Sequence, residues 1–178
     1  MKEIALGVIG KDKAIANDCI KVLYEIGARK PELIMDYVPE FVSLLSSKNN
    51  RLVWGSMTAI ACIANLKAKE IYESIDVVKK AYHEGSVITV DQSISVFAQL
   101  CKSDIEYEKT IFPFLMEHLK TCRPKEVAQH AERISICIHE KNAKEFTDVL
   151  GERIEHLNAT QIKRINKMLK FIDLPHLG

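Results

Sequence analysis

Apolar side chains recur along this chain at a fixed offset of 37 residues, and the three-residue steps inside each set are those of one helix face. A pattern that repeats in register predicts helix pairs stacked on one another, with these residues facing inward on the first helix of each pair. The four sets are Ile20, Leu23 and Ile26; Met57, Ile60 and Ile63; Ile94, Phe97 and Leu100; and Ala131, Ile134 and Cys137.

One further position of the repeat carries Gly27, Ala64, Cys101 and Ile138. Its first three members are small, so neighbouring helices can approach closely there. We therefore interpret this position as a packing column.

The second helix of a pair is marked by proline in two repeats. Pro39 and Pro113 stand two periods apart, and proline suits the first turn of a helix because its missing N–H would have no partner there. We therefore expect second helices to begin near Val38 and Phe112. The other two second helices have the stripes Ile75, Val78 and Tyr82, after Asp76 in the proline position, and, with a two-residue slip, Phe146, Leu150, Ile154 and Leu157.

Polar breaks separate the predicted pairs, and each can end one helix and cap the next. They lie at residues 46–50, 83–86 and 121–124. A last helix after Asn158 would cover one end of the stack, and residues 1–10 would cover the other. No segment shows a convincing strand pattern.

This pattern resembles that of the HEAT repeat family, with armadillo repeats as its close relative, over roughly residues 12–158. The resemblance rests on the apolar-Pro-x-apolar starts at Val38–Phe41 and Phe112–Leu115, on Leu44-Leu45, and on the small and aliphatic columns. It implies an all-α fold, a right-handed superhelix of about four helix pairs plus a C-terminal capping helix, in a single domain over residues 1–178. In such proteins the second helices line a concave face that grips other macromolecules.

Composition narrows the classes of partner. The chain has 178 residues with 25 basic and 24 acidic side chains, so its formal charge of +1 gives no global attraction to nucleic acid or anionic lipid. Its five cysteines are an odd number set mostly in apolar runs, which favours buried reduced thiols over disulfides. An export signal and an apolar run of about 18 residues are both missing, so we expect a cytoplasmic protein outside the membrane.

No set of residues specifies a reaction. The six histidines show no His-Glu-x-x-His or comparable zinc spacing, and Cys137 and His139 should point apart because only Cys137 lies in a core column. The segment Gly7–Lys13 lacks the spacing of a phosphate-binding loop. We therefore expect no catalytic residue, no metal and no cofactor.

Trp54 is the residue that fits its column least well, since Asn17, Asp91 and Ala128 occupy it in the other repeats. Either it packs across the start of its helix against the preceding pair, or it is an exposed anchor for a partner, with Asp91 on the same ridge. Alkylpurine DNA glycosylases, which are similar in being built from HEAT-like repeats, use aromatic side chains and a carboxylate to hold and hydrolyse a damaged nucleotide. Trp54 and Asp91 are the one such pair here, so this enzyme class is an alternative.

Basic side chains gather in two places, at Lys79 and Lys80 and on the last predicted helix. Each is either a solvated outer face or a contact for phosphate or an acidic partner.

Our leading hypothesis is a non-enzymatic scaffold that binds a protein or peptide, with Trp54, Asp91, Lys79 and Lys80 as candidate contacts. The alternative is a nucleic-acid-binding or DNA-alkylation-repair protein, and the oligomeric state is open. The second basic patch consists of Lys163, Arg164, Lys167 and Lys170.

Overall fold

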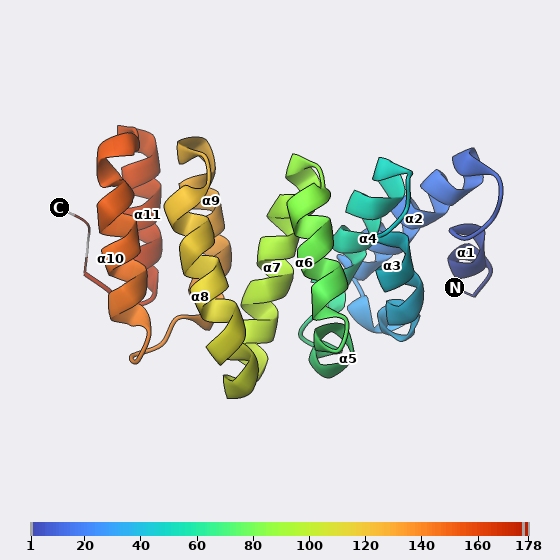
Figure 1. Cartoon of the computed structure of the whole chain (residues 1–178), viewed down its shortest axis with the longest axis horizontal. Coiled ribbons are helices and arrows are strands. Elements are labelled where there is room, and N and C mark those ends of the chain that lie inside the picture. Colours follow the sequence, from blue (N-terminus) through green and yellow to red (C-terminus); the bar gives the residue numbers. More distant parts are fainter. Residues whose placement is uncertain (1, 176, 178) are drawn as a thin grey trace. The chain divides into compact units, whose positions relative to one another are not determined.

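The computed structural model describes residues 2–175 and 177, and within these residues it contains helices and no strand (Figure 1). The prediction of an all-helical fold is therefore confirmed. The helices are α1 Lys2–Gly7, α2 Lys13–Gly27, α3 Val38–Leu44, α4 Asn50–Ile63, α5 Ala68–Tyr72, α6 Ile75–Glu84, α7 Val87–Ser103, α8 Ile105–Thr121, α9 Pro124–Ile134, α10 Ala143–Arg153 and α11 Ala159–Phe171.

The chain divides into two compact units, Met1–Val96 and Phe97–Gly178, and the boundary falls inside α7. Each unit has its own core and is described by itself. The assignment of a single domain stays a prediction. Among the described residues, no helix combines the length and the apolar character that crossing a membrane would require.

The core of the first unit lies between α2 and α4, the first helices of the first two pairs. Ile20, Leu23, Met57 and Ile60 have no exposed surface, which confirms these members of the predicted inward face, whereas Ile26 is half-buried. The small column is confirmed as a close approach, because a Cβ atom on Gly27 would lie 3.2 Å from Cβ of Cys62 on α4.

Polar side chains cap the first turns of two helices in this unit. Asp12 caps α2 by accepting hydrogen bonds from the amides of Ala14 and Ile15, and Asn49 caps α4 by accepting one from the amide of Arg51. The predicted break at residues 46–50 therefore starts a helix, as its composition predicts. Pro39 lies in the first turn of α3, also as predicted.

In the second unit, α8 packs with α10 and α9 packs with α11. The ring of Phe97, which is fully buried, meets the ring of Phe114 edge to face at a centroid distance of 5.0 Å. Ala131 and Ile134 are buried on α9, as the repeat predicts.

The second helix of the third pair was predicted to start near Phe112, and this prediction is wrong. Helix α8 begins at Ile105, where Asp104 accepts a 2.7 Å hydrogen bond from the amide of Glu106, and Pro113 lies inside the helix. Pro113 is exposed, so water can satisfy the backbone carbonyl that loses its partner. The cap at Asp104, and not the proline, determines where this helix starts.

The last two helices follow the prediction more closely. Phe146 and Leu150 are fully buried on α10, whereas Ile154 is half-buried in a 3₁₀ turn beyond its end. Helix α11 begins at Ala159 behind Asn158, whose side chain and that of Gln161 form a reciprocal capping box. The predicted terminal helix is therefore confirmed.

Candidate functional site

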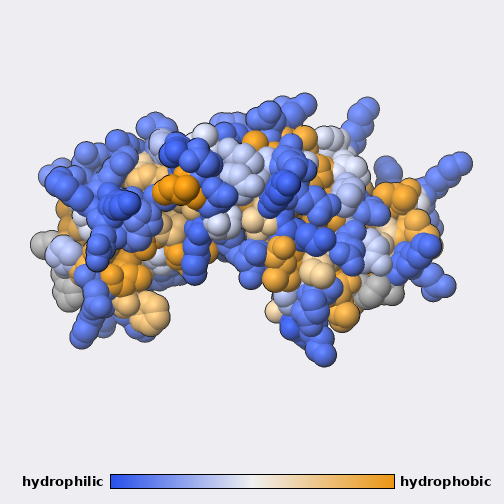
Figure 2. Space-filling view, turned by 90° about the horizontal axis from the view of Figure 1, so that it is seen from below, coloured by the Kyte–Doolittle hydropathy of each residue, from blue (hydrophilic) through white to orange (hydrophobic). Residues whose placement is uncertain are grey.

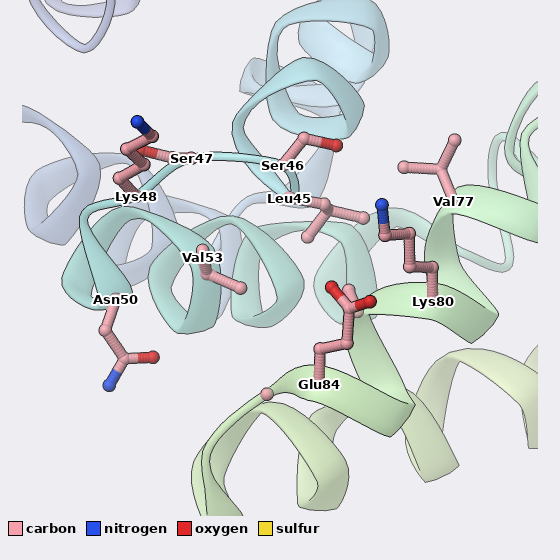
Figure 3. A pocket seen from close by; sticks show the side chains of 11 residues that line it. Leu45, Ser46, Ser47, Lys48, Asn50, Val53, Val77, Lys80 and Glu84 are labelled. Atoms are coloured by element: carbon pink, nitrogen blue, oxygen red, sulfur yellow. The ribbon is translucent and has the colours of Figure 1, made fainter.

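Two hollows adjoin in the first unit, on either side of the connection between α3 and α4. The α6 pocket, about 210 Å³, lies between this connection, the start of α4 and helix α6 (Figure 3). The α2 pocket, about 540 Å³, lies between the same connection and the start of α2. Ser47, Lys48 and Asn50 line both, so a single ligand can contact the two hollows.

The α6 pocket has an apolar floor and a charged rim. Lys80 and Glu84 are four residues apart, so they share one face of α6, and both project toward the connection (Figure 3). Leu45, Val53 and Ala81 supply buried apolar surface beneath them. The pocket thus offers an ammonium group, a carboxylate and hydroxyl groups above apolar side chains.

The α2 pocket is basic. Lys11, Lys13 and Lys48 line it, and none of its lining residues carries a carboxylate. The side-chain amide (Nδ2) of Asn49 donates a 2.9 Å hydrogen bond to the side-chain oxygen of Asn17, which ties the connection to α2. This hydrogen bond and the cap of α4 hold the wall between the two pockets in place.

Four lysine side chains therefore face one polar surface: Lys11, Lys13, Lys48 and Lys80. Within residues 2–175 and 177, none of their ammonium groups has a hydrogen bond or an ion pair. Glu84 is the one carboxylate among the residues that line these pockets. The surface has an excess of positive charge that an acidic ligand can neutralise.

Structure comparison finds helical repeat proteins along nearly the whole chain. The chain is similar to a designed armadillo repeat protein, with a TM-score of 0.65 and 12% identity over 93% of this chain and 87% of that one. It is also similar to a second designed armadillo repeat protein, solved in complex with the peptide (KR)4, with a TM-score of 0.64 and 12% identity over 96% and 88%. The fold is an armadillo/HEAT-like helical repeat.

An engineered protein matches this helical repeat with a TM-score of 0.68 and 18% identity, over 94% of this chain and 75% of that one. No family model matches the sequence, and a search of curated proteins finds no match either. Identities this low establish the fold and leave the function to be argued from the chain itself.

Trp54 lies on α4 of the helical repeat and packs against the preceding pair. Its ring centroid is 5.7 Å from that of Tyr24 on α2, and the side chain is half-buried. This is the geometry that the packing interpretation expects. Trp54 lines neither pocket, and its role as a partner anchor stays a prediction.

The other candidate contacts separate in space. Lys80 lines the α6 pocket, whereas Lys79 is half-buried on the same helix and Asp91 is half-buried on α7. Neither Lys79 nor Asp91 lines a pocket described above. Of the four predicted contact residues, the pockets therefore include Lys80 alone.

The basic cluster on α11 also divides. Lys163, Lys167 and Lys170 line a shallow hollow, but Arg164 turns toward α9 and forms an ion pair with Glu132. The hydrogen bond that the Arg164 guanidinium donates to that carboxylate raises the pKa of Arg164 above its ordinary value. Arg164 thus joins two helices of the repeat.

The cysteines are all free thiols. Cys137 is buried and His139 is exposed and bonded to Glu108, so these two side chains separate as predicted. A hydrogen bond to Cys137, together with burial, raises the pKa of the Cys101 thiol well above its ordinary value. Burial raises the pKa of the Cys122 thiol to about 11. Protonated thiols of this kind are weak nucleophiles.

Three side chains that can ligate a metal lie together in the second unit. One ligand atom each from His118, Cys122 and His130 can be chosen so that all lie within 4.8 Å of one another. The histidine pair has Nε2 of His118 and Nδ1 of His130 2.8 Å apart. A search for zinc motifs in the sequence missed this group, although His118 and Cys122 stand four residues apart at the end of α8.

Proposed function

We propose that this chain is a non-enzymatic helical repeat scaffold that binds an acidic peptide segment of a partner protein across the α2 and α6 pockets. The supporting observation is the pair of adjoining pockets with four unpaired lysine side chains and shared lining residues. Helical repeats commonly present extended surfaces of this kind to other macromolecules. One similar designed armadillo repeat protein was solved with the basic peptide (KR)4, which supports peptide binding on this fold, whereas the acidic character of the peptide proposed here rests on the lysine side chains.

The chemistry of the surface favours an acidic occupant. An exposed lysine–carboxylate pair contributes about 0.2–1 kcal/mol, so four such pairs steer and orient a peptide without giving tight binding. Ser46, Ser47 and Asn50 add hydroxyl and amide groups that can bond an extended backbone. The hydrophobic contribution comes from Leu45, Val53 and the other apolar residues of the floor.

The surface beyond the pockets supports a polar mode of binding. On the face that Figure 2 shows, hydrophobic side chains form separate patches between hydrophilic ones. A partner there meets no broad apolar surface of the kind that large permanent interfaces bury. We therefore expect moderate affinity that falls as salt concentration rises.

Lys48 is the residue to test because it lines both pockets. Lys48→Glu removes one attraction and adds one repulsion, about 1–2 kcal/mol together, so the Kd of an acidic peptide should rise by about 5- to 30-fold at low salt. Lys69→Glu on α5 makes the same charge change at an exposed position outside both pockets. The assay is fluorescence anisotropy with labelled acidic and basic peptides of equal length.

Equal affinities of Lys48→Glu and Lys69→Glu for the acidic peptide, or no binding of that peptide at low salt, would refute the proposal. Tighter binding of single-stranded or duplex DNA than of the acidic peptide, weakened by Lys48→Glu, would replace it with the nucleic-acid alternative. Trp54→Ala should leave the peptide affinity unchanged, because Trp54 lies outside the pockets. A loss of affinity in folded Trp54→Ala protein would return Trp54 to the binding surface.

A further inference from the structure

The second unit contains a cluster of nitrogen and sulfur ligands that the peptide-binding proposal does not use. We propose that His118, Cys122 and His130 bind one divalent transition-metal ion of the zinc class and join the end of α8 to α9. The cluster lies wholly within the second unit, so this proposal and the peptide-binding proposal stand or fall separately.

The helices bring the three side chains together by simple geometry. His118 and Cys122 are four residues apart, so they lie on one side of the last turn of α8, and Cys122 is the C-cap residue of that helix. Helix α9 starts at Pro124 after a tight connection and turns His130 into its buried face. Two consecutive helices therefore aim their ligand atoms at one point.

The donor set is the one that zinc prefers. Imidazole nitrogen and thiolate sulfur are its usual protein ligands, at about 2.0–2.1 Å and 2.3 Å. Tetrahedral geometry then places two nitrogens about 3.4 Å apart, and a nitrogen and the sulfur about 3.6 Å apart. The observed 2.8 Å between the nitrogens of His118 and His130, and the 4.8 Å limit for the whole group, bracket these values. Binding an ion therefore requires these two nitrogens to separate by about 0.6 Å, which we expect side-chain rotation to supply.

Burial makes this arrangement unusual for a core. His130 has no exposed surface and His118 is 5% exposed, yet their ring nitrogens face each other near the half-buried thiol of Cys122. The neighbouring buried positions of α9 are apolar, among them Val127 and Ile134. In such surroundings two imidazoles stabilise the core less than aliphatic side chains of the same volume would. They can, however, supply two nitrogen ligands to a metal ion.

The surroundings supply rigidity and a fourth ligand position. Arg153 of α10 donates hydrogen bonds to the backbone carbonyls of Lys120 and Cys122, which fixes the end of α8. Glu126 lies close enough to Cys122 and His130 for its charge to act on both, and it is now bonded to Arg123. Either this carboxylate or water can complete a tetrahedron, because Cys122 is half-buried at the open side of the cluster.

Cobalt(II) is the probe because a thiolate–cobalt bond gives a charge-transfer band in the near ultraviolet, and tetrahedral cobalt gives intense visible bands. The full chain, without a histidine tag and treated with chelator, should bind one Co²⁺ with both signals, and Zn²⁺ should displace it. The variant Cys122→Ser should lose the charge-transfer band and bind at least about 100-fold more weakly, since losing an outer partner of a ligand already costs 10- to 100-fold. The control Cys19→Ser removes a half-buried thiol outside the cluster and should match the wild type.

A second measurement uses the wild-type chain alone. Zn²⁺ should protect Cys122 from alkylation, as measured by mass spectrometry of the digested protein, and should leave the rate at Cys19 unchanged. Circular dichroism checks that Cys122→Ser is folded. Absence of the charge-transfer band, equal cobalt affinity of folded Cys122→Ser and wild type, or no protection of Cys122 by Zn²⁺ would each overturn the proposal.

Discussion

Gly55→Ala adds one methyl group where α4 crosses α2, and we expect it to destabilise the first unit. The new Cβ atom would lie 2.7 Å from Cγ1 and 3.2 Å from Cγ2 of Ile20. Comfortable contacts between carbon atoms are about 3.5–4.0 Å, so one of the two helices must move by several tenths of an ångström or more. Ile20 is fully buried and branched at Cβ, so its χ1 angle has one strongly preferred value in a helix and cannot turn the atoms away.

The magnitude follows from two opposing contributions. Overpacking a well-filled core costs about 1–3 kcal/mol, and replacing glycine by alanine in a helix interior gains about 1 kcal/mol. We therefore expect Gly55→Ala to lower the free energy of unfolding by about 1 kcal/mol. Gly151→Ala on α10 is the matched control, because no atom lies within 4 Å of the Cβ position there. Gly151→Ala should therefore gain helix stability without the cost of overpacking, and raise the free energy of unfolding of the second unit by about 1 kcal/mol.

The assay is urea denaturation followed by circular dichroism and by the fluorescence of Trp54, the single tryptophan, which lies in the first unit. The fluorescence midpoint should fall in Gly55→Ala. In Gly151→Ala the change should be seen by circular dichroism, since the substitution lies in the second unit. A Gly55→Ala protein at least as stable as the wild type would refute the close approach of α2 and α4 on which the reasoning depends.

Three further predictions concern the second unit. Pro113→Ala restores a backbone donor inside α8 and should stabilise the chain by about 1–3 kcal/mol in the same denaturation assay; a loss of stability would mean that the proline ends the helix. Asp104→Ala removes the cap of α8 and should cost about 1 kcal/mol, measured in the same way, and no change would contradict the role of the cap. Cys101 should react with iodoacetamide far more slowly than Cys19 in native protein and equally fast in urea, because its hydrogen bond to Cys137 and its burial raise the pKa of the Cys101 thiol and keep it protonated.

The sequence predicts the helices and their inner faces well because burial follows the 37-residue period. Ile20 and Ile60 are both fully buried, as the register expects. Pro113 shows where such reasoning fails. The same apolar-Pro-x-apolar motif lies at the start of α3 and in the middle of α8, because the cap at Asp104 adds two turns before it.

The α2 and α6 pockets could not be predicted from the 37-residue period. They lie at the ends of helices, where a connection meets residues from α2 and α6 whose separation along the chain is set by no repeat. The cluster of His118, Cys122 and His130 was not predicted, because a spacing of four residues between His118 and Cys122 matches no zinc motif by itself. The third member, His130, joins them through the packing of α9 on α8, which the sequence leaves open.

A comparison with Trp54 explains why both proposed binding sites lie at connections between helices and not in the repeating columns. A residue that departs from its column still has a neighbouring pair beside it, and for Trp54 that neighbour supplies Tyr24, whose ring takes up the extra volume. The polar side chains of a connection lie outside the repeating columns, so the period assigns them no packing partner in the neighbouring pair. The connection between α3 and α4 thus leaves Lys48 unpaired between two pockets, and the turn between α8 and α9 leaves Cys122 half-buried beside two histidines. Substitution of Lys48 or Cys122 should therefore alter binding with little effect on folding, whereas substitutions in the columns should do the reverse.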